Sequence, residues 1–153
     1  GPTQQEQDQA IARVLYFFEK HWEELLKFSR RTPRQLERWA ARYGYKERPA
    51  ELLDYAKKGY HGGRYTCVNL QNDATVEFRM FRGTLRPNTI LATLELLDRI
   101  CDMALCLTDD ELKAVPWTSF AAGISKDSYP ELIQYLKERT LYVNEPVESE
   151  ADA

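Results

Sequence analysis

The stretch RYTCVNLQNDATVEFRMFRG, residues 64–83, decides the fold expected for this chain. Two runs within it, 65–71 and 75–82, are rich in β-branched and aromatic residues, and the polar pair Asn72-Asp73 separates them. Such side chains favour strands, and a short polar break between two strand-like runs favours a tight turn. The stretch therefore predicts an antiparallel β-hairpin.

The register of this hairpin follows from the alternation of side chains between the two faces of a strand. A slip of one residue would place apolar side chains opposite polar ones at every pair. A three-residue loop, Asn72, Asp73 and Ala74, avoids this mixture and pairs Val68 with Phe78, Leu70 with Val76 and Asn69 with Glu77. One face then carries Val68, Leu70, Val76, Phe78 and Met80, and the other carries Tyr65, Cys67, Asn69, Glu77, Arg79 and Phe81.

Helical patterns fill the chain before the hairpin. Apolar residues recur at helical spacing from Gln5 to Arg31 without Gly or Pro, which predicts one long helix. Thr32 and Pro33 predict the start of a second helix, because Thr is a favoured N-cap and Pro fits the first helical position. Pro49 opens a third, short helix that ends before residue 59.

Further helices are expected after the hairpin. Pro87 opens a long helix to Leu107, and Thr108 with Glu111 forms the capping box of the next one. Short helices at 117–124 and 129–139 and an extended segment at 141–147 complete the pattern. The expected fold class is α+β: an antiparallel β-hairpin packed against a long helix and several further helices. The stripe expected to cover the hairpin comprises Ile90, Leu91, Leu94, Leu97, Ile100, Ala104 and Leu105.

Length and charge limit the class of protein. The 153 residues are 43% hydrophobic, which suits one domain with its own core, expected over 3–147 with an acidic, disordered tail at 148–153. A formal net charge of -3 gives no overall attraction to nucleic acid or anionic membranes. The chain contains neither a membrane-spanning apolar run nor a signal-peptide pattern, so no membrane association and a cytoplasmic location are expected.

Cysteine and histidine usage points the same way. Cys67, Cys101 and Cys106 form an odd set without a CxxC motif, so we expect buried thiols in a reducing compartment rather than disulfides. His21 and His61 lie far apart in sequence, which gives a zinc site little support.

The polar face of the predicted hairpin carries the candidate chemistry. Glu77 and Arg79 lie two residues apart on one strand, so their side chains would point the same way about 7 Å apart. A carboxylate can hold a hard cation such as Mg²⁺, and a guanidinium can bind a phosphate or carboxylate through two hydrogen bonds. From spacing alone, a solvated or cross-strand ion pair is the more common meaning of this pattern.

Two other features allow a functional and a structural interpretation. His61, between glycines, could be a ligand or a base, although loop histidines are more often simply solvated. A basic run, Arg30, Arg31, Arg34 and Arg38, could bind phosphate, although a solvated helix surface is the more common outcome.

The hairpin also carries a family resemblance. Residues 64–70, RYTCVNL, followed by 75–85, TVEFRMFRGTL, resemble the amidoligase family of glutamine synthetase-like carboxylate-amine ligases. In that family a late strand with the same E-x-R pattern precedes a proline-containing turn and a long helix, and Arg86-Pro87-Asn88 and the helix after it follow in this order here. The resemblance is clearest over 60–106 and implies the C-terminal portion of such a ligase, or a stand-alone relative that kept only this half.

The resemblance implies specific roles. Glu77 would be a Mg²⁺ ligand, Arg79 would contact ATP phosphate or the substrate carboxylate, Arg82 would assist catalysis, and Asn69 would contact the nucleotide. The implied reaction activates a small-molecule or peptide carboxylate with ATP as an acyl phosphate, which an amine substrate then attacks to form an amide. The residues before Tyr65 contain no convincing strand, so most of such an active site is not expected within this chain.

Two further expectations remain open. A two-stranded hairpin is marginally stable, so we expect a homodimer, pairing with a missing N-terminal half, or pairing of a hairpin edge with the segment 141–147. The rival to the ligase is a non-catalytic binding module, in which the hairpin and its arginines recognise a phosphate on protein or nucleic acid.

Overall fold

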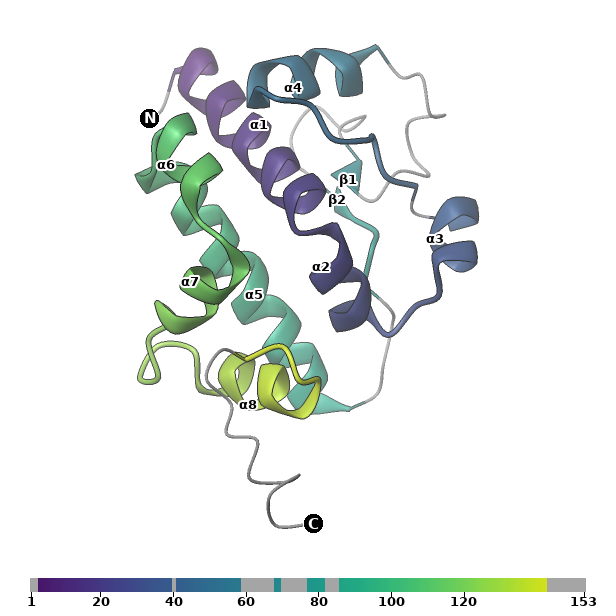
Figure 1. Ribbon diagram of the computed structural model, residues 1–153, viewed down its shortest axis with the longest axis vertical. Helices are drawn as coiled ribbons and strands as arrows, with labels where there is room; N and C mark the ends of the chain where they lie inside the picture. Colours follow the sequence, from purple (N-terminus) through teal and green to yellow (C-terminus); the bar gives the residue numbers. More distant parts are fainter. Residues whose placement is uncertain (1–2, 40, 59–67, 70–76, 82–85, 143–153) are drawn as a thin grey trace.

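The computed structural model describes residues 3–39, 41–58, 68–69, 77–81 and 86–142, without the side chains of Arg38, Trp39, Asn69 and Glu77. The described chain forms eight helices and one pair of short strands (Figure 1). In chain order they are α1 Gln4–Lys20, α2 Trp22–Ser29, α3 Pro33–Trp39, α4 Pro49–Lys57, β1 Val68–Asn69, β2 Glu77–Phe78, α5 Pro87–Cys106, α6 Asp109–Ala114, α7 Trp117–Ala122 and α8 Pro130–Glu138.

Local signals set most helix starts. Thr108 accepts a hydrogen bond from the backbone N–H of Glu111, whose carboxylate accepts one from the Thr108 N–H, so the predicted capping box is confirmed. Thr32 caps α3 and exchanges the same pair of bonds with Gln35. Pro49 and Pro87 stand at the first positions of α4 and α5, as predicted. These starts need no tertiary contact, because each bond joins residues within one turn.

The prediction of one unbroken helix from Gln5 to Arg31 is wrong at one point. His21 separates α1 from α2, with φ -108° and ψ 32°, outside the helical range. Its backbone N–H still bonds to Phe17 O, and the Leu25 N–H still bonds to His21 O, both at 3.0 Å. The apolar spacing continues across the break, so periodicity alone could not reveal it.

Helix α1 forms the centre of the protein. Tyr16, Phe17 and Phe18 are consecutive, so they point in three directions around the helix, and each is at most 1% exposed. Helices α4, α5 and α6 pack on α1, and α8 packs on α5 (Figure 1). Burial of each aromatic side chain stabilises the fold by about 2–3 kcal/mol.

The expected fold class, α+β, is wrong: the described chain is an α-helical protein. Its strands β1 and β2 are two residues long each, and the chain bends at Met80 and Phe81, within the stretch predicted to continue as a strand. One pair of such short strands cannot form a sheet layer, so helices supply the core. Strand propensity depends strongly on context, and here the packing around α1 decides the class.

The register of the strand pair is confirmed. Val68 pairs with Phe78 and Asn69 pairs with Glu77 in an antiparallel arrangement. The predicted loop at 72–74 and the pair of Leu70 with Val76 lie outside the described residues.

The apolar stripe predicted for α5 is partly wrong. Ile100 and Ala104 are buried, together with Ala92, Leu96 and Met103. The helix is apolar on more than one side, so the pattern did not decide which side faces the core. Ile90, Leu91, Leu94 and Leu105 are instead exposed, by 43–71%.

The prediction of buried cysteines is wrong for the two that the structure describes. Cys101 and Cys106 are free thiols, but Cys106 is exposed and Cys101 is half-buried rather than buried. Cys67, the tail at 148–153 and most of the segment at 141–147 lie outside the described residues. Among the described helices, none combines the length and the apolar character that crossing a membrane requires.

Candidate functional site

The predicted site residues lie around the strand pair, and the structure describes them unequally. The backbones of Asn69 and Glu77 are directly paired, whereas their side chains lie outside the described part. Arg79 follows β2 and is half-buried. Arg82 and His61 lie outside the described residues. The structure thus brings the backbones of three of the four predicted positions, Asn69, Glu77 and Arg79, to one place.

The apolar side of the strand pair is part of the helical core. Val68 and Met80 are fully buried, and the Phe78 ring lies 5.6 Å from that of Phe18 on α1. Phe78 also lines a small apolar cavity of about 240 Å³ with residues of α1 and α5. The helix after Pro87, α5, was predicted to cover this face. Helix α1 also covers it, because Phe18 of α1 supplies the ring contact.

The predicted position of Phe81 on the polar face of the hairpin is wrong. It was expected on the polar face with Arg79, yet its ring lies 6.1 Å from Phe18 and 5.7 Å from Phe28. The bend at Met80 and Phe81 ends the alternation, so consecutive residues can both contact the core.

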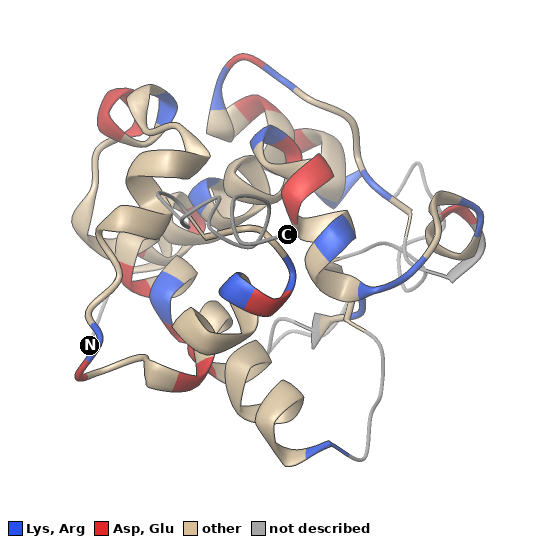
Figure 2. Ribbon diagram, turned by 60° about the horizontal axis from the view of Figure 1, so that its bottom comes forward, with Lys and Arg blue, Asp and Glu red and all other residues tan. Residues whose placement is uncertain are grey.

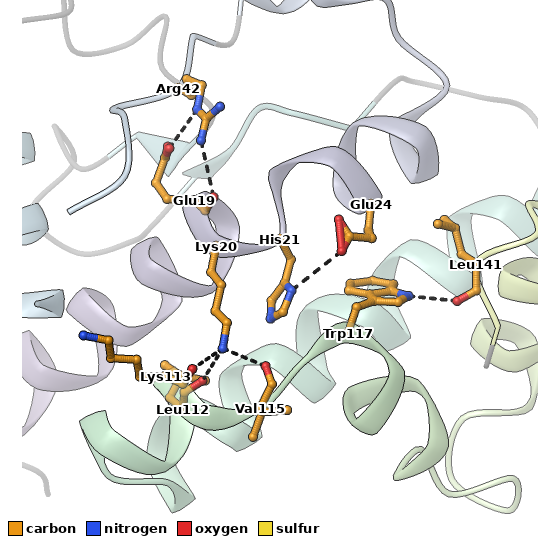
Figure 3. A network of polar contacts seen from close by, with 10 residues as sticks. All are labelled: Glu19, Lys20, His21, Glu24, Arg42, Leu112, Lys113, Val115, Trp117 and Leu141. Atoms are coloured by element: carbon orange, nitrogen blue, oxygen red, sulfur yellow. Dashed lines mark hydrogen bonds and ion pairs between the residues drawn. The ribbon is translucent and has the colours of Figure 1, made fainter. Parts of the chain in front are cut away.

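A buried carboxylate anchors β1 to α1. Glu19 Oε1 accepts a hydrogen bond from Arg42 Nε at 2.8 Å, and Glu19 Oε2 accepts one from the Tyr43 N–H at 2.9 Å. The Tyr43 hydroxyl donates to Val68 O at 2.5 Å. Figure 3 shows Arg42 reaching over Glu19, and its guanidinium carbon lies 4.9 Å from the centre of the Trp22 ring. Glu19, Arg42 and Tyr43 therefore fix the position of β1.

Sequence reasoning missed this anchor. Glu19 lies on the same helical stripe as Leu15 and Trp22, and all three are buried. A carboxylate on an apolar stripe needs a buried partner, which is a signal that the sequence contained. The partner itself, more than twenty residues away, was not readable from spacing.

A second polar contact holds α6 to α1. Lys20 Nζ donates to the carbonyl oxygens of Leu112 at 3.3 Å, Val115 at 2.8 Å and Lys113, which end α6 (Figure 3). Burial, and then the charge of Lys113, lower the pKa of Lys20. A cation at the carbonyl end of a helix is favourable, so this contact is structural.

His21 lies beside Lys20 and is also buried. Its ring lies 4.6 Å from Phe17 and 5.6 Å from Trp117, and Nε2 has no hydrogen-bond partner in the described part of the chain. Burial, and then the charge of Lys20, lower the pKa of His21 to about 4. Glu24 Oε1 is 4.0 Å from Nδ1, too far to offset this burial. The imidazole is therefore neutral near pH 7 and packs as part of the core.

The described residues contain no group of three His, Cys, Asp or Glu side chains that could hold a metal ion. Mg²⁺ in ATP sites needs only one or two protein carboxylates, because phosphates and waters supply its other ligands. The residue types paired in this register, the carboxylate of Glu77 and the amide of Asn69, are oxygen donors that suit Mg²⁺. Asn69 and Glu77 therefore offer ligand types that suit Mg²⁺, namely one amide oxygen and one carboxylate.

Comparison with protein families, curated proteins and solved structures finds no match to this chain.

Proposed function

We propose that this chain is the metal- and phosphate-contacting C-terminal part of an ATP-dependent carboxylate-amine ligase. The observation that carries the proposal is the pairing of Asn69 with Glu77, with Arg79 two residues further on. The E-x-R pattern carries the resemblance to amidoligases, and this register gathers the three residues to which that resemblance gives a role.

In the proposed reaction, the substrate carboxylate attacks the γ-phosphorus of ATP, which gives an acyl phosphate and ADP. An amine then attacks the acyl carbon, the C–O bond to phosphate breaks, and an amide and inorganic phosphate form, with a proton lost from the amine. Mg²⁺, when bound, neutralises charge on the phosphates. Glu77 would hold that ion, Asn69 would orient the nucleotide, and Arg79 and Arg82 would stabilise the charge that develops on the transferred phosphoryl group.

These residues supply only part of the required positioning. Acyl-phosphate chemistry needs nucleotide, metal, carboxylate and amine in one arrangement, and much of the rate acceleration comes from that arrangement. The proposal therefore predicts weak Mg-ATP binding without amide formation by the 153-residue chain.

A cytoplasmic location belongs to the same proposal. The free thiols Cys101 and Cys106 suit a reducing compartment, because oxidising compartments favour paired cysteines.

Titration of the purified chain with ATP, with and without Mg²⁺, tests the function. We expect binding that requires Mg²⁺ and that weakens about tenfold in both Glu77→Gln and Arg79→Ala, because each change removes one charge-assisted contact. Lys126→Ala is the matched control, since Lys126 is exposed in the connection between α7 and α8. It should bind as the unchanged chain does.

Two results would contradict the proposal. The first is the absence of any ATP binding, and the second is binding that needs no Mg²⁺ and survives both substitutions. The second result would favour the non-catalytic phosphate-binding module. Amide formation by the unchanged chain that is lost in Glu77→Gln would instead show that this chain contains a complete active site. The prediction of binding without amide formation would then be wrong.

A further inference from the structure

A basic pocket lies at the end of α2, apart from the residues proposed for ligase chemistry. It has a volume of about 550 Å³ and is lined by Lys27, Arg30, Arg31 and Arg139, and Glu23 is the only carboxylate among the described residues of its lining. Basic and acidic positions are otherwise interspersed over the described helices (Figure 2). Arg139 joins the others because α8 ends beside the end of α2, with Arg139 Nη2 2.9 Å from Lys27 O.

Backbone and hydroxyl oxygens hold two of these cations, Lys27 and Arg139, in place. Arg139 donates from Nε and Nη2 to Lys27 O at 3.2 and 2.9 Å, and Lys27 Nζ donates to the Thr140 hydroxyl. The ion pairs found among the described residues include none of Lys27, Arg30 and Arg139. The head groups of Lys27 and Arg139 are therefore restricted in position, while no carboxylate of the described residues neutralises their charges.

The backbone at this pocket is unusual. Arg30 and Thr140 are the two non-glycine residues with positive φ in the described part of the chain, at 62° and 56°. Arg30 is the C-cap of α2, a place where glycine commonly adopts this conformation at lower cost. Arg30 lines the pocket, and Thr140 contacts its lining, because the Thr140 hydroxyl accepts a hydrogen bond from Lys27 Nζ. Strained backbone of this kind clusters at functional sites.

We propose that this pocket binds the phosphate group of a small phosphorylated molecule. Guanidinium groups match the geometry of phosphate oxygens, and lysine adds a point charge. A volume of about 550 Å³ leaves room for an organic part beside the phosphate. Leu26 and Thr32 offer one apolar and one hydroxyl contact to that part. The proposal does not rest on the ligase function, since it uses neither Mg²⁺ nor Glu77 and Arg79.

Inorganic phosphate is the probe that tests this site. Its binding to the full chain is followed by NMR of the backbone amides at constant ionic strength, with acetate and chloride as the comparison anions. We expect saturable shifts at the ends of α2 and α8 for phosphate and none for the other two anions. A second series with glycerol phosphate shows whether an organic part adds affinity.

Two substitutions change the pocket in opposite directions. Arg30→Gly removes a cation and also relieves the positive φ, so the fold is kept while phosphate binding weakens about fivefold. Glu23→Gln removes an opposing carboxylate from the lining, so binding strengthens roughly twofold. Lys126→Ala, which removes the same charge as Arg30→Gly from a residue outside the pocket lining, should leave phosphate binding unchanged.

Each other outcome refutes the site. Equal shifts with acetate or chloride would mean general ionic attraction, and an equal loss in Lys126→Ala would mean the same. Shifts that never saturate would mean no site. Loss of phosphate binding in Arg79→Ala would place the anion at the strand pair instead, which separates a failure of this proposal from a failure of the ligase proposal.

Discussion

His21 makes the stability of this protein depend on pH between neutral and mildly acidic conditions. Its pKa is about 4 in the folded chain against 6.5 for the unperturbed group. Above pH 6.5 the imidazole is neutral in both states, so it adds no pH dependence there. Between pH 6.5 and 4 the unfolded chain binds the proton and the folded chain does not, so stability falls as the pH is lowered. Below pH 4 both states are protonated and the full loss has accrued.

The size of the loss follows from the difference in pKa. A gap of about 2.5 between 6.5 and 4 corresponds to about 3 kcal/mol in full. Most of it, about 2 kcal/mol, accrues between pH 7 and 5. The groups that face the ring account for the direction: Phe17 and Trp117 exclude water, Lys20 repels the imidazolium, and Glu24 at 4.0 Å provides only a weak attraction.

Urea unfolding of the unchanged chain and of His21→Phe at pH 7 and pH 5 measures this effect. Phenylalanine keeps the ring packing and removes the buried Nε2 that has no partner in the described part. The carboxylates titrate in both proteins, so their contribution cancels in the difference between the two free energies of unfolding. His21→Phe should therefore gain about 2 kcal/mol relative to the unchanged chain when the pH is lowered from 7 to 5. A difference that stays constant with pH would refute the burial argument.

Two further predictions concern the buried anchor and the exposed face of α5. Glu19→Ala should lower the free energy of unfolding by about 3–4 kcal/mol, since Arg42 and the Tyr43 N–H lose their buried acceptor. Urea unfolding measures it, and an equal loss in the exposed-site control Glu37→Ala would contradict the reasoning. The unchanged chain is expected to dimerise through the exposed apolar residues of α5, and Leu94→Glu should give a monomer at little cost to folding because Leu94 is 58% exposed. Light scattering decides this, and a monomeric unchanged chain at high concentration would end the dimer hypothesis.

Signals that act within one helical turn were readable from the sequence. The caps at Thr32 and Thr108 and the prolines that open α4 and α5 were predicted correctly, because each involves neighbours along the chain. The register of β1 and β2 was also predictable, because one face had to be apolar. Alternation then failed at Phe81, where a bend ended it.

Contacts between distant residues decided the rest. The α+β class failed because the packing around α1 needed no sheet, although the strand signal was real at Val68 and Phe78. The break at His21 left the apolar spacing intact, so the pattern could not show it. Arg30 was recognised as a possible phosphate contact, whereas Arg139 could join it only once α8 was placed beside α2.

Arg31 links the basic pocket to the chain that follows the strand pair. Arg31 lines the pocket, and its Nη2 donates a hydrogen bond to Phe81 O at 3.5 Å. Phe81 lies two residues after Arg79 in the sequence. Phe81 in turn packs on Phe18 and Phe28, so core contacts hold the chain at Phe81. The pocket lining and the proposed ligase residues have no member in common, so two anions can bind without sharing a ligand. Mg-ATP and phosphate should therefore bind together rather than compete, and competition would mean that both titrations report a single site.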